Sequence, residues 1–234
     1  MIKQECHRAM QPPNPPTNPN PKPTGLTASA GISRTDGTLY VVTGATRTGK
    51  TTWTAQRVKH DRRLLVWDSA DEWGFKFRCQ RVTDIGQLAQ AVKPGAVDRH
   101  IAFVAPVTPL NFAYFCRLAW VYVRARPGTL IVEELADVTS PGKAPVYWGE
   151  IVRKGLRYGP SIYALTQRPS ESDKTVIGNA SILHVHQMAR LDDSKYMARE
   201  LRVADDLVEH LLPFHWIERD RRSKRLTNGR LGAR

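Results

Sequence analysis

A glycine-rich stretch near the start of the chain has the residue types that bind the phosphates of a nucleotide. GATRTGKTT (44–52) matches the spacing G-x-x-x-x-G-K-[ST] without a gap. Glycine lets backbone amides approach phosphate oxygens closely, the Lys50 ammonium suits the β- and γ-phosphates, and the Thr51 hydroxyl suits Mg²⁺. The predicted phosphate-binding residues are Gly44, Ala45, Thr46, Arg47, Thr48, Gly49, Lys50, Thr51 and Thr52. The alternative is a loop that binds nucleotide without hydrolysing it.

Two adjacent carboxylates end a second apolar stretch, TLIVEE (129–134). Ligands bind at the carboxyl ends of the strands in open α/β sheets, so both side chains are expected beside the phosphate loop. We predict that Glu133 holds Mg²⁺ partly through water and that Glu134 polarises the attacking water. The usual motif has aspartate in the first position, so Glu133 is a departure from it. The alternative is a solvated pair of acids at a strand end.

An amide follows a third apolar stretch, in SIYALTQRPSES (161–172). Pro169 has no N–H for a further ladder bond, so the strand ends before it. Gln167 lies at the edge of a core, where a polar group needs a partner. We predict that this partner is the nucleotide, and the alternative is that Gln167 only caps the strand.

Apolar strands and helices alternate along the chain, which predicts an α/β fold with a mostly parallel sheet and helices on both faces. The predicted strands are 38–44, 63–68, 100–105, 129–134, 161–166 and 181–186. The predicted helices are 50–60, 85–92, 110–124 and 145–157, with two short helices after 192. The helix that begins at Lys50 points its positive end toward the bound phosphates.

The composition divides the chain into three parts. Residues 12–23 contain seven of the sixteen prolines, so 1–24 is predicted to be a flexible arm. Residues 25–216, which contain the predicted strands and helices, are predicted to form a P-loop ATPase domain. Residues 217–234, with seven Lys and Arg against two acids, are predicted to form a basic hairpin or tail.

The composition of the whole chain also narrows the class of partner. A net charge of +13 favours a polyanion, either nucleic acid or a membrane surface. The sequence contains no run of about 18 apolar residues, so it predicts no transmembrane helix. Residues 1–10 lack the apolar core of a secretion signal. The three cysteines lie far apart and predict neither a disulfide framework nor a zinc site, which fits a reducing cytosol.

Four stretches together resemble the FtsK–HerA superfamily of DNA-pumping ATPases. They are GATRTGKTT, LLVWDSADEWG, LIVEELADV and RKGLRYGPSIYALTQRPSE. Within the superfamily, the chain looks most like the genome-packaging ATPases of tailless icosahedral viruses with an internal membrane, the tectivirus type. The resemblance implies a RecA-like core in which strand 161–166 lies between strands 38–44 and 129–134. It therefore implies that Gln167 touches the γ-phosphate or the attacking water.

The resemblance also implies an activity and its partners. We expect an ATPase that uses ATP and Mg²⁺ to translocate double-stranded DNA and to package a viral genome into a preformed capsid. A homo-oligomeric ring is implied, expected to be a hexamer, with capsid-vertex or membrane proteins as partners. Its expected location is the host cytoplasm, or the virion at a packaging vertex. In such rings a basic residue of the helix before strand 161–166 reaches the neighbouring subunit; Arg157 is the preferred candidate and Arg153 the alternative.

Three other functions stay open at this stage. An ATPase of phage assembly, extrusion or DNA transfer would share the core, although the filamentous-phage type usually carries a transmembrane helix. A small-molecule P-loop kinase needs a mobile lid with several arginines, and residues 106–128 offer only Arg117, Arg124 and Arg126. A DNA-binding scaffold without enzymatic activity would not need Lys50 and Glu134.

Overall fold

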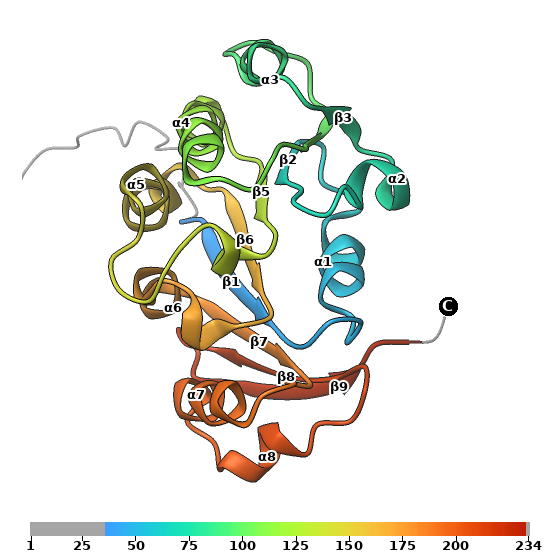
Figure 1. Ribbon diagram of the computed structural model, residues 1–234, viewed down its shortest axis with the longest axis vertical. Helices are drawn as coiled ribbons and strands as arrows, with labels where there is room; N and C mark the ends of the chain where they lie inside the picture. Colours follow the sequence, from blue (N-terminus) through green and yellow to red (C-terminus); the bar gives the residue numbers. More distant parts are fainter. Residues whose placement is uncertain (1–35, 233–234) are drawn as a thin grey trace, which may run out of the picture. The chain divides into compact units, whose positions relative to one another are not determined.

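The computed structural model describes residues 36–232, and its central feature is a nine-stranded sheet (Figure 1). The predicted arm, 1–24, lies outside the described residues. The strands are β1 (Thr38–Thr43), β2 (Leu64–Trp67), β3 (Gln80–Val82), β4 (His100–Phe103), β5 (Thr129–Val132), β6 (Ser161–Thr166), β7 (Ile182–His186), β8 (His215–Asp220) and β9 (Leu226–Arg230).

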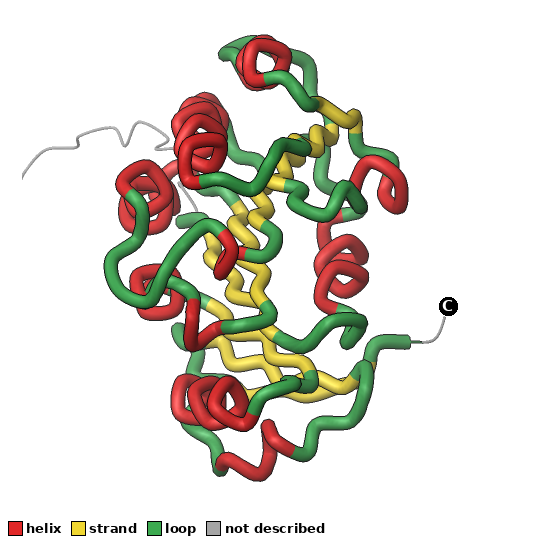
Figure 2. The backbone as a smooth tube through the Cα atoms, viewed as in Figure 1, coloured by secondary structure: helices red, strands yellow, loops and turns green. Residues whose placement is uncertain are grey.

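Helices connect the strands and flank the sheet on both sides (Figure 2). The α-helices are α1 (Lys50–Val58), α2 (Trp73–Phe77), α3 (Ile85–Val92), α4 (Pro109–Ala125), α5 (Val146–Lys154), α6 (Lys174–Asn179), α7 (Leu191–Leu201) and α8 (Asp205–Glu209). The short 3₁₀ helices are η1 (Leu135–Asp137), η2 (Gly155–Tyr158) and η3 (Pro169–Glu171). Within residues 36–232, no helix combines the length and the apolar character needed to cross a membrane.

The strand order is β3-β4-β2-β5-β6-β1-β7-β8-β9, and β1 to β7 run parallel. This order confirms that β6 is inserted between β1 and β5, as the resemblance implies. All parallel strands therefore end on one side of the sheet, which we call the carboxyl side, and begin on the other, the amino side. The predicted class, a mostly parallel sheet covered on both faces, is confirmed.

The two faces of the sheet bury different residues because side chains alternate along each strand. In β2, Leu65 and Trp67 join the larger apolar cluster, which includes α3 to α7. Leu64 and Val66 join the smaller cluster, which includes α1 and α2. Every residue of β2 is buried, as expected for a parallel strand covered on both faces.

The predicted basic hairpin or tail is a hairpin, and it extends the sheet. Strand β8 pairs antiparallel with β7, and β9 pairs antiparallel with β8. Ile217 lies opposite Val185 and is 7% exposed, so apolar burial fixes the hairpin to the core. Strand β8 begins at His215, two residues before the predicted segment 217–234. The predicted domain boundaries themselves stay predictions.

Three short elements, α2, β3 and α6, are not predicted by the sequence pattern. Helix α2 has five residues, of which only Trp73 is buried, and β3 has three, of which only Val82 is buried. Neither is long enough to show a period in its apolar residues. Elements this short depend on tertiary contacts for their stability.

Candidate active site

The phosphate loop, the acidic pair and the amide after β6 lie together on the carboxyl side of the sheet. Gly44 follows β1, Glu133 follows β5 and Gln167 follows β6. These strands are neighbours, and their register sets Thr43 opposite Thr166, so the residues that follow them are adjacent. The structure thus brings together the predicted site residues apart from the two arginines.

The phosphate loop, 44–49, requires glycine at both ends. Gly44 has φ 153° and Gly49 has φ 108°, in the left-handed region that favours glycine. A Cβ atom on Gly44 would also lie only 2.6 Å from the Cβ of His186. Helix α1 begins at Lys50, directly after the loop, so its N-terminal amides face the loop. This geometry suits a bound phosphate.

Lys50 is held inside its own loop. The residue is 6% exposed, and its Nζ donates to the carbonyl oxygen of Ala45 at 3.1 Å. Thr48 Oγ1 donates to the same oxygen at 2.8 Å. Burial lowers the pKa of Lys50, and the negative charges of Glu134 and Glu133 oppose that shift. A buried ammonium of this kind gains from charge-assisted hydrogen bonds, which phosphate oxygens supply.

Glu133 is buried against the side chain of Trp73. The residue is 4% exposed, and its Oε1 accepts from Trp73 Nε1 at 2.8 Å. Burial raises the pKa of Glu133 to about 7, against the opposing effect of hydrogen bonds from Trp73 and Thr51. Asp68, at the end of β2, accepts from the backbone N–H of Trp73 at 2.9 Å. The polar residues after β2 therefore position Trp73, and Trp73 positions Glu133.

The residues around Glu133 fit Mg²⁺ if a nucleotide supplies the other ligands. Thr51 offers a hydroxyl next to the Glu133 carboxylate, and both are oxygen donors of the kind that Mg²⁺ prefers. No group of three or more His, Cys, Asp or Glu in the described part of the chain is arranged to hold a metal by itself. Mg²⁺ is commonly bound through one or two carboxylates, waters and substrate phosphates, which matches this donor set.

Gln167 joins the phosphate loop to the second carboxylate. Its Nε2 donates to Glu134 Oε1 at 2.7 Å, and its Oε1 accepts from Thr46 Oγ1 at 2.5 Å. Glu134 has φ 45° and ψ 56°, a left-handed conformation that costs a non-glycine residue on the order of 1–3 kcal/mol. Unlike Glu133, Glu134 is only half-buried. The pair therefore consists of one enclosed carboxylate and one that water reaches.

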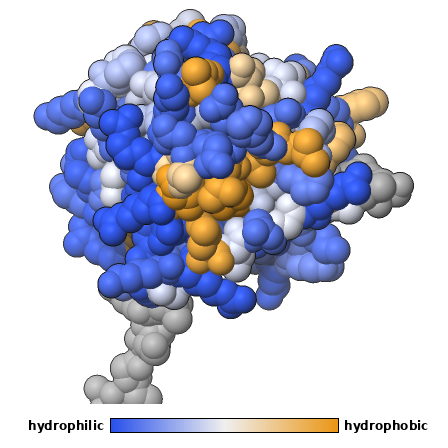
Figure 3. All heavy atoms as spheres, turned by 90° about the horizontal axis from the view of Figure 1, so that it is seen from below, coloured by the Kyte–Doolittle hydropathy of each residue, from blue (hydrophilic) through white to orange (hydrophobic). Residues whose placement is uncertain are grey.

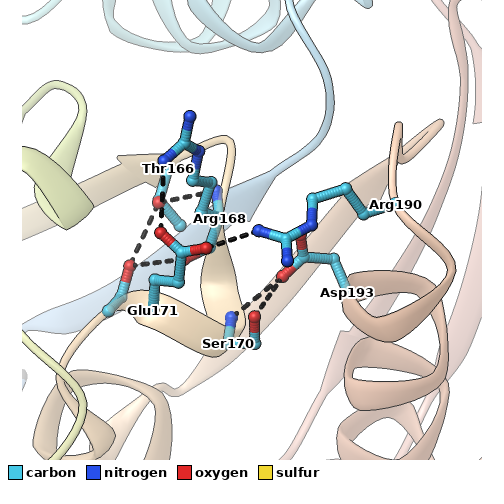
Figure 4. Close-up of polar contacts among 7 residues, drawn as sticks. Thr166, Arg168, Ser170, Glu171, Arg190 and Asp193 are labelled. Atoms are coloured by element: carbon cyan, nitrogen blue, oxygen red, sulfur yellow. Dashed lines mark hydrogen bonds and ion pairs between the residues drawn. The ribbon is translucent and has the colours of Figure 1, made fainter.

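The loop that follows β6 is fixed to the start of α7 (Figure 4). Arg168 and Arg190 both form ion pairs with Glu171. The N–H and the hydroxyl of Ser170 both donate to Asp193 Oδ1, at 3.1 and 2.7 Å. These contacts join the end of β6 to the start of α7.

The two predicted trans-acting arginines lie apart from this cluster. Arg153 is exposed near the end of α5, and Arg157 is exposed in η2, which leads into the amino end of β6. Arg157 Nε donates to the carbonyl oxygen of Lys154 at 3.1 Å. The guanidinium of Arg153 covers Gly149, where a Cβ would lie 2.7 Å from Nη1. Arg157 thus lies on the amino side of the sheet, away from the phosphate loop of its own chain.

A hollow of about 680 Å³ opens beside the phosphate loop, and no motif in the sequence predicts it. Its lining residues are Thr52, Lys76, Phe77, Phe214, Arg230, Leu231 and Gly232. Phe214 has φ 64° and is 44% exposed, and its carbonyl oxygen accepts from the N–H of Leu231 at 2.8 Å. A Cβ on Gly49 would lie 2.9 Å from Leu231 Cδ2. Leu231 therefore packs against the phosphate loop at Gly49.

An apolar patch surrounded by hydrophilic side chains is visible on the surface seen from below (Figure 3). The large apolar residues that are exposed between the start of α7 and the start of β8 are Leu191, Leu207, Leu212 and Phe214. Since Phe214 also lines the hollow, these exposed residues extend from the phosphate loop toward α8.

Comparisons with known proteins agree with the fold. No family model matches the chain. The chain is 39% identical to protein P9 of Pseudoalteromonas phage PM2 over 155 residues, which are 62% of this chain and 68% of that protein.

Solved structures with the same fold include a viral and a bacterial protein. The genome packaging NTPase B204 of Sulfolobus turreted icosahedral virus 2, in complex with AMPPCP, superposes with a TM-score of 0.71 at 13% identity, over 85% of this chain and 99% of that one. VirB4 of Thermoanaerobacter pseudethanolicus superposes with a TM-score of 0.61 at 8% identity, over 84% of this chain and 90% of that one. At these identities the likeness establishes the shared fold.

Proposed function

This chain belongs to the family of protein P9 of Pseudoalteromonas phage PM2, and from that premise we propose that it is an FtsK–HerA-type ATPase that drives double-stranded DNA into a viral capsid. The fold shared with B204, a genome packaging NTPase, supports the proposal. The observation that carries it is the Gln167 amide, which hydrogen-bonds both to Thr46 of the phosphate loop and to Glu134. Such an amide is positioned to couple the state of the nucleotide to movement.

Glu134 is the proposed general base. It orients the water that attacks the γ-phosphorus and accepts its proton as the bond to the β–γ bridging oxygen breaks, which yields ADP and inorganic phosphate. Lys50 and the amides of residues 44–49 stabilise the charge on the phosphate oxygens. The water-accessible position of Glu134 and the buried position of Lys50 both support these roles.

Thr51 and Glu133 are the residues that would hold Mg²⁺, which neutralises charge on the β- and γ-phosphates when bound. The Trp73 hydrogen bond fixes one oxygen of Glu133. The hydroxyl of Thr51 lies next to the same carboxylate. The side chain of Glu133, which is longer than the aspartate of the usual motif, is thus held in place by Trp73, a residue outside that motif.

Gln167 is proposed to report the presence of the γ-phosphate. An amide donates and accepts, and both functions are engaged, by Glu134 and Thr46. A γ-phosphate that competes for these groups would displace the end of β6. The ion pairs of Glu171 and the Ser170–Asp193 hydrogen bonds would then carry the displacement to α7.

The hollow beside the phosphate loop is proposed to hold the nucleobase. Thr52, a lining residue of the hollow, directly follows Lys50 and Thr51, the residues proposed to bind the phosphates and Mg²⁺, so the hollow lies beside the proposed phosphate site. Phe77, Phe214 and Leu231 provide the aromatic and apolar surface on which a base packs.

A ring of identical subunits, expected to be a hexamer, is proposed to complete the site. The exposed position of Arg157 supports a role in the neighbouring subunit, with Arg153 as the alternative. The exposed apolar residues near Phe214 support a contact surface, because monomers rarely leave such residues together in water. The further partners proposed are double-stranded DNA and capsid-vertex or membrane proteins, in the host cytoplasm or at the packaging vertex of the virion.

Phosphate release from ATP, measured with and without double-stranded DNA, tests the proposed function. The wild-type protein is expected to hydrolyse ATP and to do so faster with DNA. Lys50→Ala is expected to lose ATP binding, whereas Lys59→Ala, which changes an exposed lysine after α1, is expected to keep it. A rate of hydrolysis that is the same with and without DNA would contradict the proposed DNA translocation. An unchanged ATP affinity in Lys50→Ala would contradict the assignment of residues 44–52 as the phosphate site.

A further inference from the structure

A basic hollow lies between the end of α7 and the turn that joins β8 to β9. It has a volume of about 460 Å³, and its lining residues are Arg199, Glu200, Arg202, Arg219, Arg221 and Lys224. Five of these six side chains are cationic. The turn itself adds Arg222 and Arg225, both exposed. This surface is separate from the proposed ATP site and has no role in the hydrolysis described above.

Two of the arginines in the hollow are held rigidly. Arg219 donates to the carbonyl oxygens of Leu201 and Lys224. Arg221 donates to the carbonyl oxygen of Ile177 at 2.6 Å and pairs with Glu200. Guanidinium groups fixed in this way lose little further entropy on binding an anion.

The exposed cations of the turn have no carboxylate partners in the described part of the chain. Arg222, Lys224 and Arg225 form no ion pair within residues 36–232. The nearby Asp220 forms no ion pair with them; its Oδ1 accepts from the backbone N–H groups of Arg222 and Ser223, at 2.8 and 3.1 Å. That carboxylate shapes the turn and leaves the cations available.

The position of the turn separates it from the nucleotide. Strand β8 is antiparallel to β7: Trp216 pairs with His186 at the carboxyl end of β7, and Asp220 pairs with Ile182 at its amino end. The turn therefore lies on the amino side of the sheet, opposite the phosphate loop. A polyanion bound there does not compete with ATP.

Stabilisation of α7 does not explain the cluster. Cations near the C-terminus of a helix interact favourably with its dipole, which accounts for Arg199 and Arg202. The effect is confined to the last turn of the helix. It does not reach Arg222 and Arg225, which lie in the hairpin turn.

We propose that the turn between β8 and β9, together with the basic hollow, holds phosphate groups of the double-stranded DNA backbone. The inference rests on the proposed function, because a packaging motor must grip every sequence alike. Phosphate contacts meet this need, since they position a protein on a duplex without reading bases. Arginine forks bind phosphate oxygens in pairs, and the cluster is built mostly of arginine.

The test compares two triple variants that remove the same charge. The turn variant carries Arg222→Gln, Lys224→Gln and Arg225→Gln. The control variant carries Lys93→Gln, Lys143→Gln and Lys174→Gln, three exposed lysines that belong neither to the turn nor to the lining of the hollow. Fluorescence anisotropy with a labelled DNA duplex over a series of salt concentrations gives the slope of log K against log salt. Each lost phosphate contact is expected to reduce that slope by about 0.9, so the turn variant should lose about 2–3.

The control variant is expected to keep the wild-type slope, and both variants are expected to keep the wild-type melting temperature. If the slope changed equally in the two variants, net charge alone would explain the effect and the proposal would be wrong. An unchanged slope in the turn variant would also overturn the proposal. Vesicles with anionic lipid form a second arm: if the turn variant loses vesicle binding alone, the surface serves a membrane and the proposal is wrong. A wild-type protein that binds no duplex would instead overturn the proposed function itself.

Discussion

The two sides of the sheet differ in how their polar groups are arranged. On the carboxyl side, Lys50, Glu133 and Trp73 are buried and bonded to neighbours, and Gln167 links two loops through one amide. On the amino side, the cations of the hairpin turn are exposed. A buried network responds as a unit, because loss of one partner leaves another unsatisfied. Exposed cations act independently and are screened by salt. The protein therefore separates chemistry, which needs fixed geometry, from the proposed grip on DNA, which needs only charge.

The largest expected effect concerns Arg157, which lies on the amino side of the sheet. In a ring of subunits it is proposed to reach the phosphate loop on the carboxyl side of a neighbouring subunit. An arginine supplied in trans stabilises the transition state by about 10³–10⁵ in rate, so Arg157→Ala should be nearly inactive alone. Mixing it with the equally inactive Glu134→Gln protein should restore ATP hydrolysis, because some interfaces then combine an intact arginine with an intact glutamate. Under proven subunit exchange, failure of the mixture for both Arg157→Ala and Arg153→Ala would refute the trans role.

Glu134→Gln tests the accessible carboxylate by itself. Loss of a positioned base is expected to slow hydrolysis by about 10²–10⁴ while ATP binding is retained. Asp137→Asn, an exposed acid in η1, serves as the matched control and should hydrolyse ATP at the wild-type rate. Single-turnover kinetics measure both. If Glu133→Gln has this effect and Glu134→Gln does not, the two roles are reversed.

Gln167→Ala should break the link between the phosphate loop and Glu134 without removing either. The expected result is near-normal ATP affinity and a loss of DNA-stimulated turnover of about 10², comparable to removal of one positioned hydrogen-bond donor. Gln90→Ala, in the exposed part of α3, is the control. Normal stimulation in Gln167→Ala would leave this amide with only a capping role.

Phe214→Ala tests the proposed base pocket. Loss of stacking on one aromatic ring is worth about 1–3 kcal/mol, so ATP affinity should fall by about 5- to 150-fold. Inorganic tripolyphosphate, which has no base, should bind the variant as it binds the wild type. Leu212→Ala is the matched control, since Leu212 is an exposed neighbour that does not line the hollow. Equal losses for both ligands would show that the hollow does not hold the base.

A further prediction is a pH dependence of the free energy of unfolding caused by His186, which lies against Gly44. Burial, helped by the charges of His184 and Lys50, lowers the pKa of His186 to about 3 from 6.5. Between these values the unfolded chain binds a proton that the folded chain does not, so stability falls as the pH decreases from 6.5 toward 3. The slope contributed is at most about 1.4 kcal/mol per pH unit.

Urea unfolding measured at several pH values between 7 and 4 checks this dependence. His186→Gln should flatten the pH profile, and His60→Gln, at an exposed position, should not. A profile that is equally steep in His186→Gln would assign the acid sensitivity to other groups.

The sequence predicted those parts of the site that follow directly from strand ends. Lys50, Glu134 and Gln167 each come after an apolar strand, and parallel strands bring such positions to one side of the sheet. The place of β6 between β1 and β5 was implied by the family resemblance, since nothing in strand composition specifies the order of strands.

The remaining features depend on contacts between distant segments. Trp73 and Glu133 are 60 residues apart, and no periodic pattern of apolar residues in their two segments predicts that they meet. The hollow combines Phe77 with Phe214 and Leu231, which meet only because β8 and β9 are added beside β7. Packing of this kind is decided by tertiary structure and leaves no local signal.

The two edge strands limit how copies of this protein can associate. An unpaired strand edge is a template for another backbone, and proteins avoid such pairing with short or charged edges. Strand β3 has three residues and exposes Gln80 and Arg81, and β9 exposes Arg230 at its end. Continuous sheets across subunits are therefore disfavoured, and contacts between copies are left to side chains. Assemblies joined in this way exchange subunits and open without unfolding, whereas a fibre joined by backbone ladders does not.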